Sequence, residues 1–336
     1  MATRWRKIVQ LIELARFDLL FSVISNTWLI TFLAFRIEPR SNLNPGLMQL
    51  GLFKSLVITA VVSGGLVGFA LALRDVLNAR HDRAFAPARP IPSGRVHIQH
   101  AAAAAVLSLI IALTAALSLG KSSTVIALLA SGGILFYNLA GRFIPAVGIV
   151  CLGLIHVLIM AIVNPYMSFA WPIILTMSHS MACATLRYFL AGKRPRISRT
   201  DGGLICIGWA FWTLVVIGLM SARGGTIASD YHLIWVGPTL ASLVFVICTW
   251  QITRGRLSSG KSRRLAANRF VRLSVLWLMV YDACWLFSAG LWYQSAAIAG
   301  LFISSVVLSR IQLFVRLPIS SMSYSLGMDR RIGSDG

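Results

Sequence analysis

Apolar segments long enough to cross a membrane recur along most of this 336-residue chain and limit what it can fold into. A helix needs about 20 apolar residues to span the hydrocarbon core of a bilayer. Only 12% of the residues are charged, whereas about a quarter are charged in an average soluble domain. So few charges cannot cover a soluble globule of this size, which excludes an ordinary cytosolic enzyme. The sequence therefore predicts an all-α, polytopic integral membrane protein.

We expect ten membrane spans, at residues 17–36, 54–73, 98–119, 123–140, 144–163, 169–190, 203–221, 232–251, 273–290 and 293–315. The last two are separated only by Ala289-Gly290 and the polar Gln294. In the second span, Gly64, Gly65 and Gly68 form a small-residue face, which would let a neighbouring helix approach closely.

The positive charges lie between the spans and indicate an orientation. The chain has 31 Lys and Arg against 10 Asp and Glu, a net charge of +21. If the N-terminus is cytoplasmic and the chain alternates, 26 of the 31 basic residues fall on the cytoplasmic side. Loops that face the anionic cytoplasmic leaflet carry such an excess. We therefore expect membrane lipids, and no nucleic acid, as partners of these loops, in either a bacterial plasma membrane or an organelle membrane.

One stretch, residues 74–95, combines the scarce acidic residues with dense basic and turn residues at a membrane boundary. Asp75, Asn78 and Asp82 are spaced i, i+3 and i+7, and so they share one face of a helix. Three oxygen side chains suit Mg²⁺, which binds one or two carboxylates together with substrate phosphates. Neighbouring arginines can form charge-assisted bonds to phosphates. A capped helix end with surface salt bridges would explain the same spacing.

The segment Arg89-Pro90-Ile91-Pro92-Ser93-Gly94-Arg95, which follows these acids, resembles the UbiA-type membrane prenyltransferase superfamily. Those enzymes carry N-D-x-x-D-x-x-x-D and then R-P-(I/L)-(P/A)-(S/A)-G-(R/K). Asp75 and Asp82 match two aspartates of the motif, whereas Arg74 stands in place of Asn and Asn78 in place of Asp. The resemblance covers at least residues 10–220, and the family has nine helices where ten are counted here.

Two shorter segments extend the resemblance. Tyr137-Asn138-Leu139-Ala140-Gly141-Arg142 resembles the family's Tyr-x-x-x-Lys/Arg segment. Leu11-Ile12-Glu13-Leu14-Ala15-Arg16 resembles its L-x-R-P opening, with Phe17 in place of Pro.

The resemblance implies one transmembrane domain over residues 1–336, with catalytic cytoplasmic loops at about 74–97, 140–146 and 187–202. It implies Mg²⁺ held by Asp75, Asn78 and Asp82. The residues expected to bind a prenyl diphosphate are Arg89, Arg95, Arg142, Lys193 and Arg194. The substrate-cavity candidates are Tyr137, Asn138, Tyr188 and Asp282.

The second acidic motif of the family, D-x-x-x-D, is absent from the sequence after the sixth span. Phe189 and Lys193 occupy the places of its two aspartates. A second metal ion is therefore not expected. Either Lys193, Arg194 and Arg196 replace its charge and bind the diphosphate directly, or the ionisation chemistry has been lost.

Three functions stay open at this stage. The first is transfer of a prenyl group from an isoprenoid diphosphate to an aromatic or other lipophilic acceptor. The second is a UbiA-type terpene cyclase, in which the double bonds of the substrate itself capture the carbocation. The third is a non-catalytic or transport-type membrane protein.

Asp282 is an acid in the middle of a predicted span. An ionisable group at that depth is costly and suggests a functional role. A structural partner, such as Arg187 or a tyrosine, is the alternative.

Overall fold

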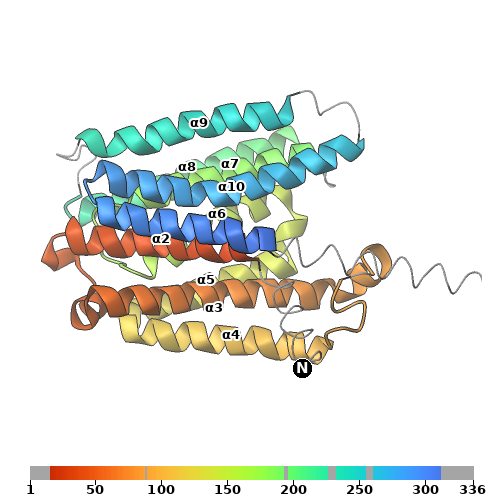
Figure 1. Cartoon of the computed structure of the whole chain (residues 1–336), viewed down its shortest axis with the longest axis horizontal. Coiled ribbons are helices and arrows are strands. Elements are labelled where there is room, and N and C mark those ends of the chain that lie inside the picture. Colours follow the sequence, from red (N-terminus) through yellow and green to blue (C-terminus); the bar gives the residue numbers. More distant parts are fainter. Residues whose placement is uncertain (1–15, 88, 193–195, 226–231, 255–259, 312–336) are drawn as a thin grey trace, which may run out of the picture.

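The computed structural model describes residues 16–87, 89–192, 196–225, 232–254 and 260–311, and these residues form helices and connecting turns without a β-strand. The helices run side by side along one direction (Figure 1). Their bounds are α2 Phe17–Arg36, α3 Pro45–Phe85, α4 Ile98–Leu119, α5 Lys121–Leu139, α6 Pro145–Ala161, α7 Trp171–Ala191, α8 Arg199–Ala222, α9 Val236–Thr253, α10 Gly260–Ser288 and a last helix Trp292–Ile311. Short 3-10 turns lie at Arg40–Asn42, Gly141–Phe143 and His232–Trp235.

The predicted all-α membrane bundle is confirmed. Eight helices are long and apolar enough to cross a membrane, α6 is a shorter apolar helix, and α7 has 21 residues. Every predicted span coincides with a helix, including the two at the C-terminal end of the described residues. There α10 ends at Ser288 and the last helix begins at Trp292, with Gly290 between them at a φ of +74°.

Helix α3 is much longer than the span predicted within it. The summed rise of its 41 residues is about 60 Å, whereas the hydrocarbon core is only about 30 Å thick. Gly51, at a φ of 70°, separates a short first piece from the rest. The helix then continues past the apolar segment to Phe85, shortly before Pro87. We call the end of the bundle that carries residues 74–97 the motif end.

The small-residue face predicted in α3 packs against α4. A Cβ atom added to Gly65 would lie 2.7 Å from the Ser108 backbone oxygen and 2.8 Å from Ala112 Cβ. One added to Gly68 would lie 2.9 Å from Ser108 Oγ. Only glycine permits this separation, and so α3 and α4 are in close contact along the membrane.

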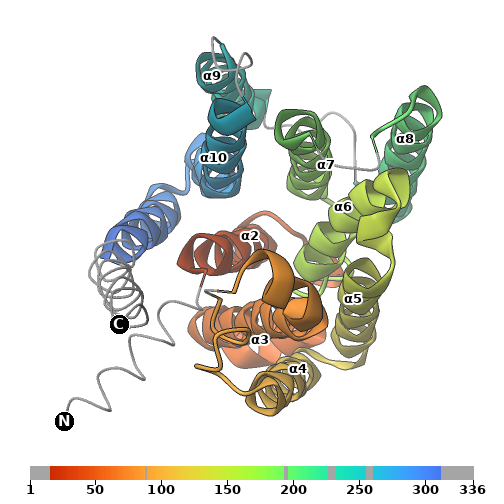
Figure 2. The ribbon, with the colours of Figure 1, turned by 90° about the vertical axis from the view of Figure 1, so that its right-hand side faces the viewer.

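Helix α2 lies inside the arrangement of helices, between α10 and α3, and also contacts α6 (Figure 2). Helices α8 and α9 lie farther out. The outward surfaces of α8 and α9 carry exposed apolar side chains, among them Ile207, Leu214, Leu243 and Val246. An apolar outer surface of this kind is what a helix facing lipid requires.

Candidate functional site

The acidic end of α3 and the Arg89–Arg95 segment that follows it are in contact at the motif end. Asp82, on the last turns of α3, is only 6% exposed. Arg89 Nη1 donates a hydrogen bond to Asp82 Oδ2 at 2.5 Å. His81 Nδ1 lies 3.8 Å from the other carboxylate oxygen. A buried carboxylate is stable only when paired, and this pair holds the loop after α3 against the helix.

The loop itself is ordered by its own hydrogen bonds. The backbone N–H of Ser93 donates to the Arg89 carbonyl at 2.9 Å, and that of Val96 donates to the Pro90 carbonyl at 3.0 Å. Gly94 has a φ of +74°, which glycine adopts without strain. Arg95 Nε donates to Ser93 Oγ at 3.0 Å. Arg89 and Arg95 therefore lie on one compact turn, as the motif predicts.

The acids and amide predicted to bind Mg²⁺ lie on consecutive turns of α3. Arg74 donates to Asp75 Oδ1 through Nε at 3.2 Å and Nη2 at 2.9 Å. Asp75 and Asp82 are about 10 Å apart along the helix axis, and Asp82 is already paired with Arg89. Within the part of the chain that the structure describes, no three His, Cys, Asp or Glu side chains are grouped so as to hold a metal ion. Asp75 and Asn78, one turn apart, are hard oxygen donors that suit a single Mg²⁺ sharing its other ligands with substrate and water.

Charges from three helices lie near Arg16. Arg16, at the start of α2, lies within electrostatic reach of Asp18, Arg74, Asp75 and Arg187. Arg74 and Asp75 come from α3, and Arg187 comes from the end of α7. These positions are far apart in sequence, and only the bundle brings them together. The sequence placed Arg187 in the expected catalytic loop 187–202 and offered it as a partner of Asp282, but it did not indicate that Arg187 lies near Arg16.

Aromatic hydroxyl groups adjoin this cluster. Tyr137, at the end of α5, lies within electrostatic reach of Arg187, Tyr188 and Arg142. The Tyr188 hydroxyl donates to the Arg142 carbonyl at 3.2 Å. The Arg142 guanidinium lies 4.7 Å from the centre of the Phe143 ring. Asn138 is buried, and its amide donates to the Ile134 carbonyl of its own helix.

The place of the family's second acidic motif carries an aromatic ring. Phe189 is 56% exposed near the end of α7, and Gly192 ends the helix in the left-handed conformation. Two of the predicted diphosphate ligands, Lys193 and Arg194, lie outside the described residues. Arg196 is described and exposed.

Asp282 lies away from the motif end. It is 1% exposed and accepts a hydrogen bond from Ser25 Oγ of α2 at 2.5 Å. The partner suggested by the sequence, Arg187, lies with the charges at the motif end instead. Ser25 was missed from the sequence, although the first span carries an unusual number of polar residues: Ser22, Ser25, Asn26, Thr27 and Thr31.

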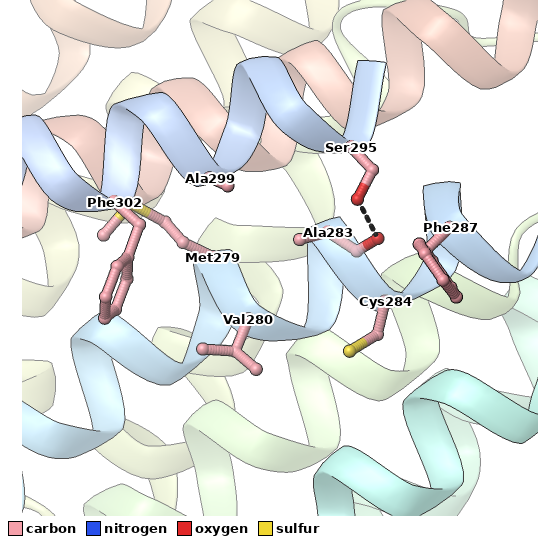
Figure 3. Close-up of a pocket in the computed structure, with 8 residues that line it drawn as sticks. All are labelled: Met279, Val280, Ala283, Cys284, Phe287, Ser295, Ala299 and Phe302. Atoms are coloured by element: carbon pink, nitrogen blue, oxygen red, sulfur yellow. Dashed lines mark hydrogen bonds between the residues drawn. The ribbon is translucent and has the colours of Figure 1, made fainter. Parts of the chain in front are cut away.

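An apolar pocket of about 270 Å³ lies between α10 and the last helix (Figure 3). Met279, Ala283, Cys284 and Phe302 are among its lining residues, and Ser295 Oγ donates to the Ala283 carbonyl beside it. None of the predicted site residues lines this pocket. The candidate site is therefore the charged cluster at the motif end.

No protein-family model matches the chain, and no curated protein matches its sequence. Solved structures match its fold. A UbiA homologue from Aeropyrum pernix K1 aligns with a TM-score of 0.51 at 15% identity, over 77% of this chain and 96% of that chain. The chain has the UbiA fold. The fold predicted from the resemblance of the Arg89–Arg95 segment is thus confirmed.

Two further structures with the UbiA fold align less well. A digeranylgeranylglyceryl phosphate synthase has a TM-score of 0.49 at 12% identity, over 83% of this chain and 98% of that chain. A UbiA homologue from Archaeoglobus fulgidus bound to DMAPP and Mg²⁺ has a TM-score of 0.39 at 13% identity, over 87% of this chain and 99% of that chain.

Proposed function

We propose that this chain is a membrane prenyltransferase. It binds an isoprenoid diphosphate at the motif end and transfers the prenyl group to an aromatic or other lipophilic acceptor. The observation that carries this proposal is the meeting of Arg16, Arg74, Asp75 and Arg187, from three helices, at one end of an apolar bundle. A ligand with an anionic head and a hydrocarbon tail fits such an arrangement.

The arginines supply the anion-binding part. Guanidinium groups bind phosphate oxygens through paired, charge-assisted hydrogen bonds. Arg16, Arg187 and Arg95 would bind the diphosphate, while Arg89 holds Asp82 and thereby fixes the loop. Arg142, with its buried Nε lacking a partner among the described residues, is a further donor. Positive charge placed where the leaving group gains negative charge lowers the barrier to ionisation.

Asp75 and Asn78 are the residues that would hold a single Mg²⁺, in keeping with their oxygen donors and one-turn spacing. In this arrangement Asp82 acts indirectly: it pairs with Arg89 and so holds in place the loop that carries Arg89. When bound, the ion supplies Lewis-acid stabilisation of phosphate oxygens.

The reaction breaks the bond between C1 of the prenyl group and the diphosphate oxygen, and the diphosphate keeps the electron pair. An electron pair of the acceptor then forms the new bond to C1, and the acceptor loses a proton to water or to the diphosphate. Tyr137 and Tyr188 adjoin the cluster and would stabilise the allylic cation through their ring faces. The prenyl chain would extend from the motif end into the bundle, with the N-terminus and the motif end on the cytoplasmic side.

The test is diphosphate release by the purified protein in lipid nanodiscs. C10, C15 and C20 prenyl diphosphates are supplied with and without Mg²⁺, and with and without aromatic acceptors. Release that requires an acceptor and yields a prenylated product supports the proposal. Release without an acceptor, together with a cyclic product, would instead identify a terpene cyclase. No release under any condition, or unchanged release by Asp75→Ala, would overturn the assignment.

A further inference from the structure

A second group of polar side chains lies inside the bundle, far from the motif end. Ser22, Ser25 and Asn26 occupy neighbouring turns of α2, and each is at most 1% exposed. Ser25 bonds Asp282 of α10. The prenyltransferase reaction proposed above uses none of these residues.

The contacts of α2 determine where Asn26 points. Ser25 faces α10 through Asp282, and Thr27 faces α3 through a 2.9 Å contact with Ser63 Oγ. Residues Phe21, Ile24 and Trp28 form the partly exposed face of the helix. Successive residues of a helix are about 100° apart, which puts Asn26, like Ser22 one turn before it, on the opposite, inward face. Helix α6 is the neighbour on that side (Figure 2).

The inward polar atoms lack partners within the described residues. Both the amide nitrogen and the oxygen of Asn26, and the hydroxyl of Ser22, are buried and make no hydrogen bond. Asp282 receives a hydrogen bond on Oδ2 from Ser25. Buried polar groups are almost always satisfied in native proteins, and each exception calls for an explanation. In a hydrocarbon environment the cost of leaving them unpaired is greater still.

This polar group is distinct from the charged cluster. Asn26 lies ten residues beyond Arg16 on the same helix, which places it about 15 Å deeper in the membrane. On α6, His156 is eleven residues from the start of the helix and therefore lies at a similar depth. It lies within electrostatic reach of His179 on α7. Helices α6 and α7 thus add two further polar side chains to the interior of the bundle.

We propose that Ser22, Asn26 and Asp282 form a polar subsite in the middle of the membrane for the hydroxyl group of a neutral, membrane-soluble alcohol or phenol. A hydroxyl both donates and accepts hydrogen bonds. It would donate to Asn26 Oδ1 or the Asp282 carboxyl group and accept from Asn26 Nδ2 or Ser22 Oγ. A charged ligand is excluded, because the apolar surroundings penalise a charge at this depth.

The test measures binding of tritiated 1-naphthol and of naphthalene to the protein in nanodiscs by equilibrium dialysis, with the signal of empty nanodiscs subtracted. No prenyl diphosphate is present, so the result is independent of the proposed transferase activity. We expect 1-naphthol to bind at least about tenfold more tightly than naphthalene. Asn26→Leu should abolish this preference and raise the thermal unfolding midpoint of the ligand-free protein, because an unpaired polar group is removed.

Two further variants make the test specific. Ser22→Ala, a small change, should weaken 1-naphthol binding severalfold without affecting naphthalene, and it decides the matter if Asn26→Leu does not fold. Ser63→Ala is the matched control, because Ser63 is buried at the same level but bonds Thr27 on the α3 side. The preference of Ser63→Ala for 1-naphthol over naphthalene should equal that of the unaltered protein. Equal binding of the two probes by the unaltered protein, or an unchanged preference for 1-naphthol in folded Asn26→Leu, would overturn the proposal.

Discussion

Arg89 Nη1 and Asp82 Oδ2 lie 2.5 Å apart, and this contact joins the exposed loop of the motif to a buried carboxylate on α3. Hydrogen bonds among the residues of the loop order it further. We propose that Asp82 fixes Arg89 and the turn that carries it. The family resemblance assigns the two residues separate roles, as a metal ligand and as a diphosphate ligand.

We expect Arg89→Gln to reduce kcat/KM for prenyl transfer about 10- to 100-fold, the usual cost of losing a group that orients a ligand-binding residue. The substitution leaves the Asp82 carboxylate buried without its counter-charge. Steady-state assays of diphosphate release measure the effect. Arg40→Gln, at the opposite end and exposed, is the control and should have no effect. Full activity of Arg89→Gln would exclude a role for the pair.

Asn78→Asp should lower the Mg²⁺ concentration that gives half-maximal activity, because a second charged ligand joins Asp75 on the next turn. Chelation by EDTA should abolish activity in both proteins, and added Mg²⁺ should restore it. Asn78→Ala should shift the Mg²⁺ dependence in the opposite direction. A Mg²⁺ titration that is the same for all three proteins would place the ion elsewhere.

Arg187→Gln should raise KM for the prenyl diphosphate about tenfold and change kcat less, because a charge-assisted hydrogen bond to the substrate is lost. Initial rates measured over a range of prenyl diphosphate concentrations test this. Lys121→Gln removes a charge at the other end of the bundle and serves as the control. If kcat falls while KM stays constant, Arg187 acts on the transition state instead.

Glu38→Gln should destabilise the end of the bundle opposite to the motif. The Glu38 carboxylate accepts hydrogen bonds from the Ser168 and Phe169 backbone N–H groups at 2.8–3.0 Å and from Ser168 Oγ at 2.7 Å. We expect a loss of about 1–3 kcal/mol in the free energy of unfolding, seen as a lower thermal midpoint in detergent. Ser41→Ala, exposed nearby, should leave the midpoint unchanged.

Gly65→Ala should also lower the thermal midpoint, because the added Cβ would lie 2.7 Å from the Ser108 backbone oxygen. Overpacking of this kind costs about 1–3 kcal/mol. The control is Gly132→Ala on α5, where an added Cβ meets nothing within 4 Å. If both variants behave alike, the close approach of α3 and α4 is not important for stability.

The sequence predicted the spans well where hydropathy and helix coincide, as at 17–36 and 98–119. It underestimated α3 and α10, because a hydropathy pattern identifies only the part of a helix that lies in lipid. In α3, a stretch that mixes charged and apolar residues continues the helix to Phe85. In α10, the basic residues after Gly260 are already helical.

The site was predicted only in part, for a different reason. Asp82 and Arg89 are seven residues apart, so a local motif could indicate both. Arg16, Arg74 and Arg187 come from three helices, and Ser25 and Asp282 are 257 residues apart. Contacts between residues so far apart in sequence depend on which helices are neighbours and which faces they present. No local sequence pattern contains that information.

The contact of Gly65 with Ser108 has a mechanical consequence. Helices α3 and α4, locked together through the membrane, hold both ends of the loop that carries Arg89 and Arg95. The two helices and this loop should therefore move as one rigid body. We therefore expect any opening that admits a bulky substrate to come from displacement of the helices opposite, among them the end of α7 with Arg187.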